Sequence, residues 1–202
     1  GICEDITKRK TAEEGLLRTT ENLRKSIGSI IQVIASVVEA KDPYTSGHQR
    51  RVANLARAIA QEMGMSNNIV EGIRMAGAIH DIGKISVPIE ILSKPGKLSD
   101  IEFNLIKTHS KIGYDILKDI DFPWPIADIV HQHHEKINGT GYPDGLKNGE
   151  ILIEARIIAV ADVVEAISTH RPYRPALGIE VALDEIEKNR GILFDESAVD
   201  AC

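Results

Sequence analysis

The sequence predicts an all-α fold, and three observations support this prediction. Apolar residues recur at helical spacing through much of the 202-residue chain, whereas no alternating apolar and polar run is long enough for a sheet. Hydrophobic residues make up 43% of the chain, so a full core is available. Aromatic residues make up only 4%, so we expect that core to consist mainly of Ile, Val, Leu and Ala.

A long helix is predicted from about Thr11 to Ala40, before a break marked by Pro43 and Gly47. Its apolar positions follow the heptad spacing of a coiled coil: Leu16, Thr20, Leu23, Ile27, Ile30, Ile34 and Val37. A dimer seam is the favoured interpretation of the first half, because charged residues there leave little else to bury. For the second half, packing against the helix's own domain is an equally good interpretation.

Two amphipathic helices follow the break. The first carries apolar residues at i, i+3, i+4 and i+7 between Val52 and Met63, and Gly64 is placed to end it. The second begins at about Asn67 and is predicted to end at Gly83. The next stretch, VPIEILSKPGKL, contains two prolines and predicts a loop.

The second half of the chain is predicted to be helical as well. Ser99 and Glu102 form a capping-box pattern that opens a helix running through His109. Pro125 begins another helix, and the stretch EARIIAVADVVEAIS is helical by its length and composition. A last amphipathic helix covers about 179–188.

Ionisable side chains interrupt the most apolar of these segments. His80 and Asp81 are adjacent near the end of one helix, and Asp162 lies in the middle of RIIAVADVVEA. A buried carboxylate is costly unless it is paired or coordinates a metal. Imidazole and carboxylate without cysteine suit a catalytic site for Zn, Fe, Mn, Ni or Co, and one carboxylate, here Asp81, can bridge two ions. His131 and His170 are interpreted as solvated or locally hydrogen-bonded.

Several nearby residues have two interpretations when each is taken alone. Lys84 could offset the charge of a phosphate or be an ordinary loop lysine. Glu165 could accept from a guanine edge or pair with an arginine. The loop HRPYRPA could clamp a phosphate with Arg171 and Arg174, or be a solvated charged loop.

Charge and composition exclude some classes of partner. The net charge of −6 argues against a nucleic-acid polymer. No stretch approaches the roughly 18 apolar residues that span a bilayer, and no secretory signal is visible, so we expect no membrane contact by this fragment. Cys3 and Cys202 lie at opposite ends of the sequence, which favours a reducing cytoplasm.

With these residues assembled, the chain resembles an HD-GYP domain, the phosphodiesterase branch of the HD metal-dependent phosphohydrolases. The resemblance covers the sequence from about Asp42 to the C-terminus. The motifs that carry it are YTSGHQRRVANLA, HDIGKISVP, LSKPGKLSDIE, HHEKINGTGYPDGL, ADVVEAISTHRPYRP and FDESAV.

The resemblance implies a helical bundle around a metal centre, and hydrolysis of cyclic di-GMP to linear pGpG, sometimes onward to GMP. The metal ligands that it implies are His48, His80, Asp81, His109, His133, His134 and Asp162. Asp81 and Lys84 are the implied catalytic residues, with Lys84 contacting the phosphate beside the nucleophile. The other substrate contacts implied are Tyr142, Pro143, Glu165, Arg171 and Arg174.

The sequence departs from the family pattern in three places. Members with three metals carry a Glu four residues before the first His; here that position is Tyr44, so we expect two divalent ions. Fe or Mn is the expected metal, with Ni, Co or Zn as alternatives. Asn138 replaces a common acidic residue, and the chain ends soon after FDES at Cys202.

The predicted organisation has three parts. Residues 1–10 resemble the end of a PAS sensor domain with its exit strand, 11–41 form a linker helix for signalling, and 42–202 form the catalytic domain. We expect a homodimer through the linker helix and a sensor domain upstream of it.

The expected mechanism is metal-assisted in-line hydrolysis, in which two metals activate a shared water that attacks phosphorus opposite the 3′-oxygen. Three alternatives stay open from the sequence. The first is an HD phosphohydrolase acting on another cyclic dinucleotide or on a phosphomonoester. The second is a binding or scaffold module without turnover. The third is a dimeric signalling connector, for which the set of potential metal ligands would have no purpose.

Overall fold

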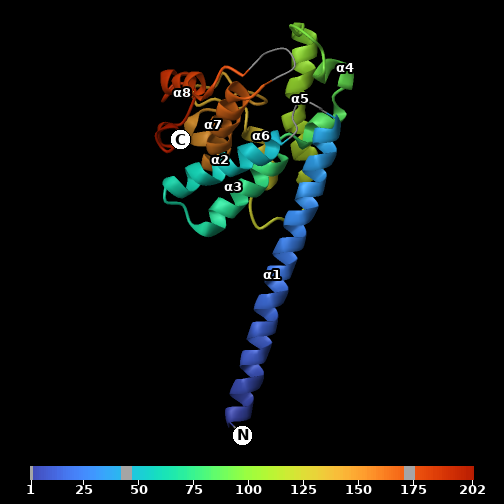
Figure 1. Cartoon of the computed structure of the whole chain (residues 1–202), viewed down its shortest axis with the longest axis vertical. Coiled ribbons are helices and arrows are strands. Elements are labelled where there is room, and N and C mark those ends of the chain that lie inside the picture. The colour runs from blue at the N-terminus through green and yellow to red at the C-terminus, as the bar shows by residue number, and fades with distance from the viewer. Residues whose placement is uncertain (1, 42–46, 171–175) are drawn as a thin grey trace.

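The computed structural model of the chain describes residues 2–41, 47–170 and 176–202. Its described part is all-α, as predicted, with no β-strand and only two isolated β-bridges. Figure 1 shows a compact bundle from which one long helix projects, with the N-terminus at the far end of that helix and the C-terminus on the bundle.

The long helix, α1, spans Ile2–Lys41 as one continuous element. The sequence predicted a start at about Thr11 and a strand before it, and this strand prediction is wrong. A strand needs a neighbour for its backbone hydrogen bonds, whereas a helix pairs these groups within itself.

The two halves of α1 have different surroundings. In the first half, Leu16 and Leu23 are exposed. In the second half, Ile31 and Val38 are buried against the domain, while Ile30 and Val37 stay exposed. The second half therefore packs on its own domain with one face and leaves an apolar stripe on another.

Five helices enclose the core. They are α2 (His48–Glu62), α3 (Asn67–Ile79), α5 (Asp100–Leu117), α6 (Ile126–Gln132) and α7 (Ile153–Ser168). Helix α2 packs against both α3 and α7, and α5 packs against α6. Ile, Val and Ala form most of the buried core, as the composition predicted, whereas leucine contributes little beyond Leu117.

Short elements complete the chain. They are the 3-10 turns η1 (Ile82–Ser86) and η2 (Asn148–Glu150), and the helices α4 (Ile89–Leu92), α8 (Ile179–Lys188) and α9 (Glu196–Asp200). Helix α8 has the predicted bounds. Helix α4 is a single turn inside the stretch predicted to be a loop, and α9 follows Asp195, whose side chain caps it by accepting from the Ala198 amide.

Helix α3 ends at Ile79, earlier than the predicted end at Gly83. After His80 the chain tightens into η1, where the Lys84 amide donates to the Asp81 carbonyl at 2.9 Å. This turn packs against α5 so closely that a methyl group on Gly83 would lie 2.7 Å from the Gly113 amide nitrogen. The contact brings His80 and Asp81 toward His109 of α5.

The helices of this fold differ in length and in apolar character. Within the described ranges, none combines the length and the apolar character that a membrane span requires.

Candidate metal centre

The seven predicted ligands converge in the middle of the bundle, although they come from positions throughout the chain. They form two groups, and within each group the potential ligand atoms lie within 4.8 Å of one another. The first group is Asp81, His109, His133 and His134, and the second is His48, His80 and Asp162.

Asp81 belongs to the first group and also faces the second. Its Oδ1 is 3.3 Å from His109 Nε2 in the first group. Its Oδ2 is 3.7 Å from His48 Nε2 and 3.5 Å from His80 Nε2 in the second. One carboxylate therefore presents an oxygen to each group, which is the arrangement of a bridging ligand.

The helix backbone fixes the orientation of three imidazoles. The Nδ1 atoms of His80, His109 and His133 lie 2.8, 2.7 and 2.6 Å from the carbonyl oxygen three residues earlier in each case. A carbonyl can only accept, so each Nδ1 carries a proton, and in the neutral ring Nε2 is left with its lone pair toward the centre. His80 and His133 stand at the C-caps of α3 and α6, where the last carbonyls lack helical partners.

His48 is oriented by a carboxylate instead. Its Nδ1 contacts the Glu165 side chain, and its Nε2 lies 3.2 Å from Asp162 Oδ1. The other oxygen of Glu165 accepts from Arg51 Nε at 2.7 Å. Of the two sequence interpretations of Glu165, the arginine pair is present, and the contact with His48 was missed because the two residues are far apart in the sequence.

The donor set fits divalent metal ions. The Nε2 atoms of His109 and His133 are 3.3 Å apart, and both carry lone pairs because both Nδ1 atoms are protonated. Two lone pairs at this distance repel unless a cation lies beside them. Among the described residues, the buried His80 Nε2 has no hydrogen-bond partner. Neutral imidazoles and carboxylates of this kind suit Zn, Fe, Mn, Ni or Co.

Burial and charge shift the protonation of the ligands in opposite directions. Burial lowers the pKa of His133 to about 3, and it lowers the pKa values of His109 and His134 as well. Burial also opposes the charged form of His48, but its contacts with Asp162 and Glu165 prevail and raise its pKa to about 9. These three histidines therefore keep their neutral form to lower pH than a free histidine does, and the neutral form is the one that binds a metal.

We expect the metal-free protein to lose stability as the pH falls below about 6.5, the ordinary histidine pKa. His133 binds its proton at about pH 3 in the folded state, so over this window the unfolded state binds more protons. The loss from His133 is about 2 kcal/mol at about pH 5. His48 contributes little to this loss, because its pKa is raised to about 9 in the folded state. Its contribution to stability is fully present below about pH 6.5 and is lost only as the pH rises toward about 9.

Urea unfolding of chelator-treated protein, carried out at neutral pH and again near pH 5, measures this loss. A His133→Gln variant should show a smaller drop in unfolding free energy between the two conditions. Equal drops in the two proteins would contradict the expectation.

Lys84 and Tyr142 border the centre. Lys84 Nζ donates to Asp81 Oδ2 at 2.7 Å, which brings a positive charge to the carboxylate between the two groups. The Tyr142 ring lies against His134, with ring centroids 4.7 Å apart, and it precedes Pro143 through a cis peptide bond. Burial raises the pKa of Tyr142, so its hydroxyl stays protonated.

Two further residues shape this border and were not predicted. The buried carboxylate of Glu135 accepts three backbone amides, those of Asp144, Gly145 and Leu146, and so fixes the loop that carries Tyr142. The ammonium of Lys107 lies 5.6 Å from the centre of the Tyr142 ring. An acidic residue directly before a glycine-rich loop is the sequence signal that could have indicated Glu135.

The described part of the structure gives no contact to the centre for the other residues singled out in the sequence. Arg171, Arg174 and Tyr44 fall outside the described residues. His131 forms a hydrogen bond of 2.8 Å with Asp144 away from both ligand groups, which agrees with its local interpretation.

Comparison with known proteins agrees with this geometry. Residues 32–198 match the protein family described as HD domain. The chain belongs to the HD-domain family. The whole chain is 39% identical over 98% of its length to the "Cyclic di-GMP phosphodiesterase response regulator RpfG" of Xanthomonas campestris, and it covers 53% of that protein.

The chain has two further similarities to known proteins. It is 40% identical over 82% of its length to the "3'3'-cGAMP-specific phosphodiesterase 3" of Vibrio cholerae, and it covers 36% of that protein. The solved structure of Bd1817, "a HDG"Y"P protein from Bdellovibrio bacteriovorus", has the same fold, with a TM-score of 0.67 at 20% identity over 88% of this chain and 60% of that one. The chain thus spans about half the length of its Xanthomonas relative, and less of the Vibrio relative.

Proposed function

We propose that this HD domain is a metal-dependent phosphodiesterase that hydrolyses cyclic di-GMP to the linear dinucleotide pGpG. The observation that carries the proposal is the position of Asp81, whose two oxygens face two separate groups of histidines, with Lys84 bonded to it. The name of the Xanthomonas relative supports cyclic di-GMP as the substrate.

The proposed centre holds two divalent ions, Fe or Mn foremost, with Ni, Co or Zn as alternatives. Bound ions would supply Lewis acidity at the phosphate and a nucleophile from water at neutral pH. Asp81 would hold both sites at a fixed separation. Lys84 has three ammonium donors, so while it contacts Asp81 it can also donate to a phosphoryl oxygen and offset its developing charge.

Further substrate contacts are proposed at the border of the centre. Tyr142 and Pro143 would shape the wall beside the phosphate. Arg171 and Arg174 would bind the dinucleotide, as the family resemblance implies. Glu165 would contact a guanine while keeping its contacts with His48 and Arg51.

A second candidate is hydrolysis of 3′3′-cGAMP, which the name of the Vibrio relative favours. The two substrates share the ring of two phosphodiesters and differ in one base. A further candidate is a module that binds a cyclic dinucleotide without turnover, and the complete ligand set argues against it.

The test is metal analysis of aerobically and anaerobically purified protein, with turnover of cyclic di-GMP, 3′3′-cGAMP and bis(p-nitrophenyl) phosphate measured on each sample. We expect about two ions per chain and release of pGpG as the fastest reaction. Preference for 3′3′-cGAMP would favour the second candidate. Tight binding of cyclic di-GMP without product, with Mn or Fe present, would refute the enzymatic proposal.

We also propose that α1 pairs with α1 of a second copy. Four apolar residues repeat every seventh position along the helix and are more than half exposed: Leu16, Leu23, Ile30 and Val37. Sedimentation equilibrium should then give twice the mass of 22.2 kDa, and a monomer at high concentration would contradict the pairing.

The proposed setting is the cytoplasm, with a sensor domain preceding residue 11 in the full-length protein. A full-length protein in which the segment before α1 folds as a sensor, and in which its signal alters turnover, would support this organisation. Turnover that ignores the upstream segment would contradict it.

A further inference from the structure

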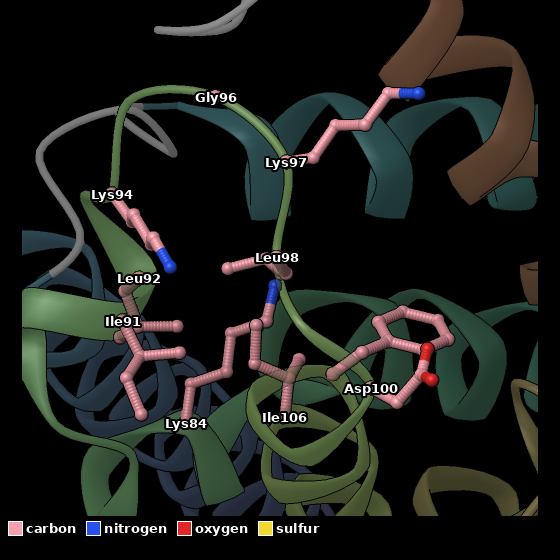
Figure 2. A pocket seen from close by; sticks show the side chains of 10 residues that line it. Lys84, Ile91, Leu92, Lys94, Gly96, Lys97, Leu98, Asp100 and Ile106 are labelled. Atoms are coloured by element: carbon pink, nitrogen blue, oxygen red, sulfur yellow. The ribbon is translucent and has the colours of Figure 1, made fainter.

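A cavity of about 490 Å³ adjoins the metal centre and is used by none of the proposed contacts except Lys84. Residues of η1, α4, the following loop and the start of α5 line it. Figure 2 shows the ammonium groups of Lys84 and Lys94 directed into the space, with Leu98 reaching in from the loop and Lys97 pointing away. The volume lies within the range of small-ligand pockets in proteins.

The walls of this cavity combine two kinds of chemistry. Ile91, Leu98, Phe103 and Ile106 give it apolar surface, on which the flat face of a nucleobase can pack. Lys84 and Lys94 bring ammonium donors for an anion to walls that also include the carboxylate of Asp100. A site with both features suits a nucleotide, since a nucleotide joins a flat base to a phosphate.

The lysines are held in place by acidic partners. Lys84 Nζ donates to Asp81 Oδ2 at 2.7 Å, so one end of the cavity is the metal centre itself. Lys94 Nζ donates to both oxygens of Glu102 at 2.8 Å, and Glu102 is fixed in turn by the capping box with Ser99. An ammonium has three donors, so Lys94 can serve Glu102 and a phosphate together.

We propose that this cavity binds the half of the cyclic dinucleotide that is not being cleaved. Its base would pack against Leu98 and Phe103, and its phosphate would lie near Lys94, while the scissile phosphate sits at the metal centre beside Lys84. The inference rests on the proposed function and adds to it the place where the second nucleotide is recognised. A phosphodiester without a second nucleoside leaves the cavity empty and gains nothing from it.

The experiment tests the cavity by placing a larger side chain in it. In Leu98→Trp an indole occupies the space, whereas Ile101→Trp adds the same group at a neighbouring position that is 82% exposed. On manganese-loaded protein, kcat/KM is measured for cyclic di-GMP and for bis(p-nitrophenyl) phosphate. The ratio of the two values should fall at least about ten-fold in Leu98→Trp, since excluding a group from its pocket has effects of that order, and it should be unchanged in Ile101→Trp.

Calorimetric binding of cyclic di-GMP to the same proteins separates the two proposals. If the wild type hydrolyses cyclic di-GMP, and Leu98→Trp has the same ratio of kcat/KM values and the same affinity for cyclic di-GMP, the cavity proposal is overturned and the proposed function stands. If the wild type binds without turnover, the proposed function fails, and the affinity of Leu98→Trp still decides the cavity. If the wild type neither binds nor hydrolyses it, both are overturned.

A second variant tests the cavity even if Leu98→Trp does not fold. Lys94→Gln removes a charge at a partly exposed position, and it should weaken cyclic di-GMP binding several-fold more than Lys111→Gln, a change at an exposed lysine on α5. Equal effects of the two changes would count against the cavity.

Discussion

Replacing His80 and Asp81 together by alanine is expected to abolish turnover while the helical fold survives. The double variant removes a ligand from the second group and the carboxylate between the groups. If metal binding supplies about 4 kcal/mol of transition-state stabilisation, the rate falls at least about a thousand-fold. Turnover of cyclic di-GMP measures the loss of rate, and elemental analysis measures the bound metal. Far-UV circular dichroism shows whether the helical fold survives.

His131→Ala is the matched control for this variant. It removes a histidine that contacts Asp144 and belongs to neither ligand group, so metal content and turnover should stay near wild-type values. Undiminished hydrolysis by the double variant would refute the assignment of the centre, whatever its metal content.

Gly83→Ala is expected to cause a large loss of stability from a single methyl group. The added carbon would lie 2.7 Å from the Gly113 nitrogen and 2.8 Å from the His109 carbonyl carbon, and both are backbone atoms that cannot rotate away. Overpacking of this kind costs about 3 kcal/mol, which lowers Tm by roughly 6–12 °C in a chain of this size. Because α5 must shift, His109 should move and metal affinity should fall as well.

Gly149→Ala provides the comparison, since among the described residues no atom lies within 4 Å of its added carbon. Thermal unfolding followed by circular dichroism, with and without metal, compares the two variants. If Gly83→Ala melts within a degree or two of Gly149→Ala, the close packing of η1 on α5 does not hold in solution.

Local sequence signals predicted much of the helical fold. The Ser99–Glu102 capping box marked the start of α5, and the amphipathic pattern over 179–188 gave the bounds of α8. The end of α3 was misplaced because its last turns remain apolar as far as η1. The chain leaves the helix at His80, and four residues after Ile79 Gly83 packs closely on α5, a contact with residues distant in the sequence.

The convergence of the seven candidate ligands could be predicted because burial makes isolated ionisable residues costly, and the family resemblance completed the set. All seven of these residues do come together. The partners behind them could not be predicted in the same way. The contact of Glu165 with His48 joins α7 to α2, and the cavity at Lys94 and Leu98 exists only because a loop folds over the start of α5.

The bonds from His80, His109 and His133 to carbonyls in their own helices make ring orientation depend on the local integrity of those helices. If these imidazoles hold cations, fraying at the end of α3 or α6 would turn one of them away and break a coordination bond. By reciprocity, cation uptake would suppress fraying at both helix ends. Amide hydrogen exchange at residues 77–80 and 130–133 would then report metal occupancy, and it can be followed without any substrate.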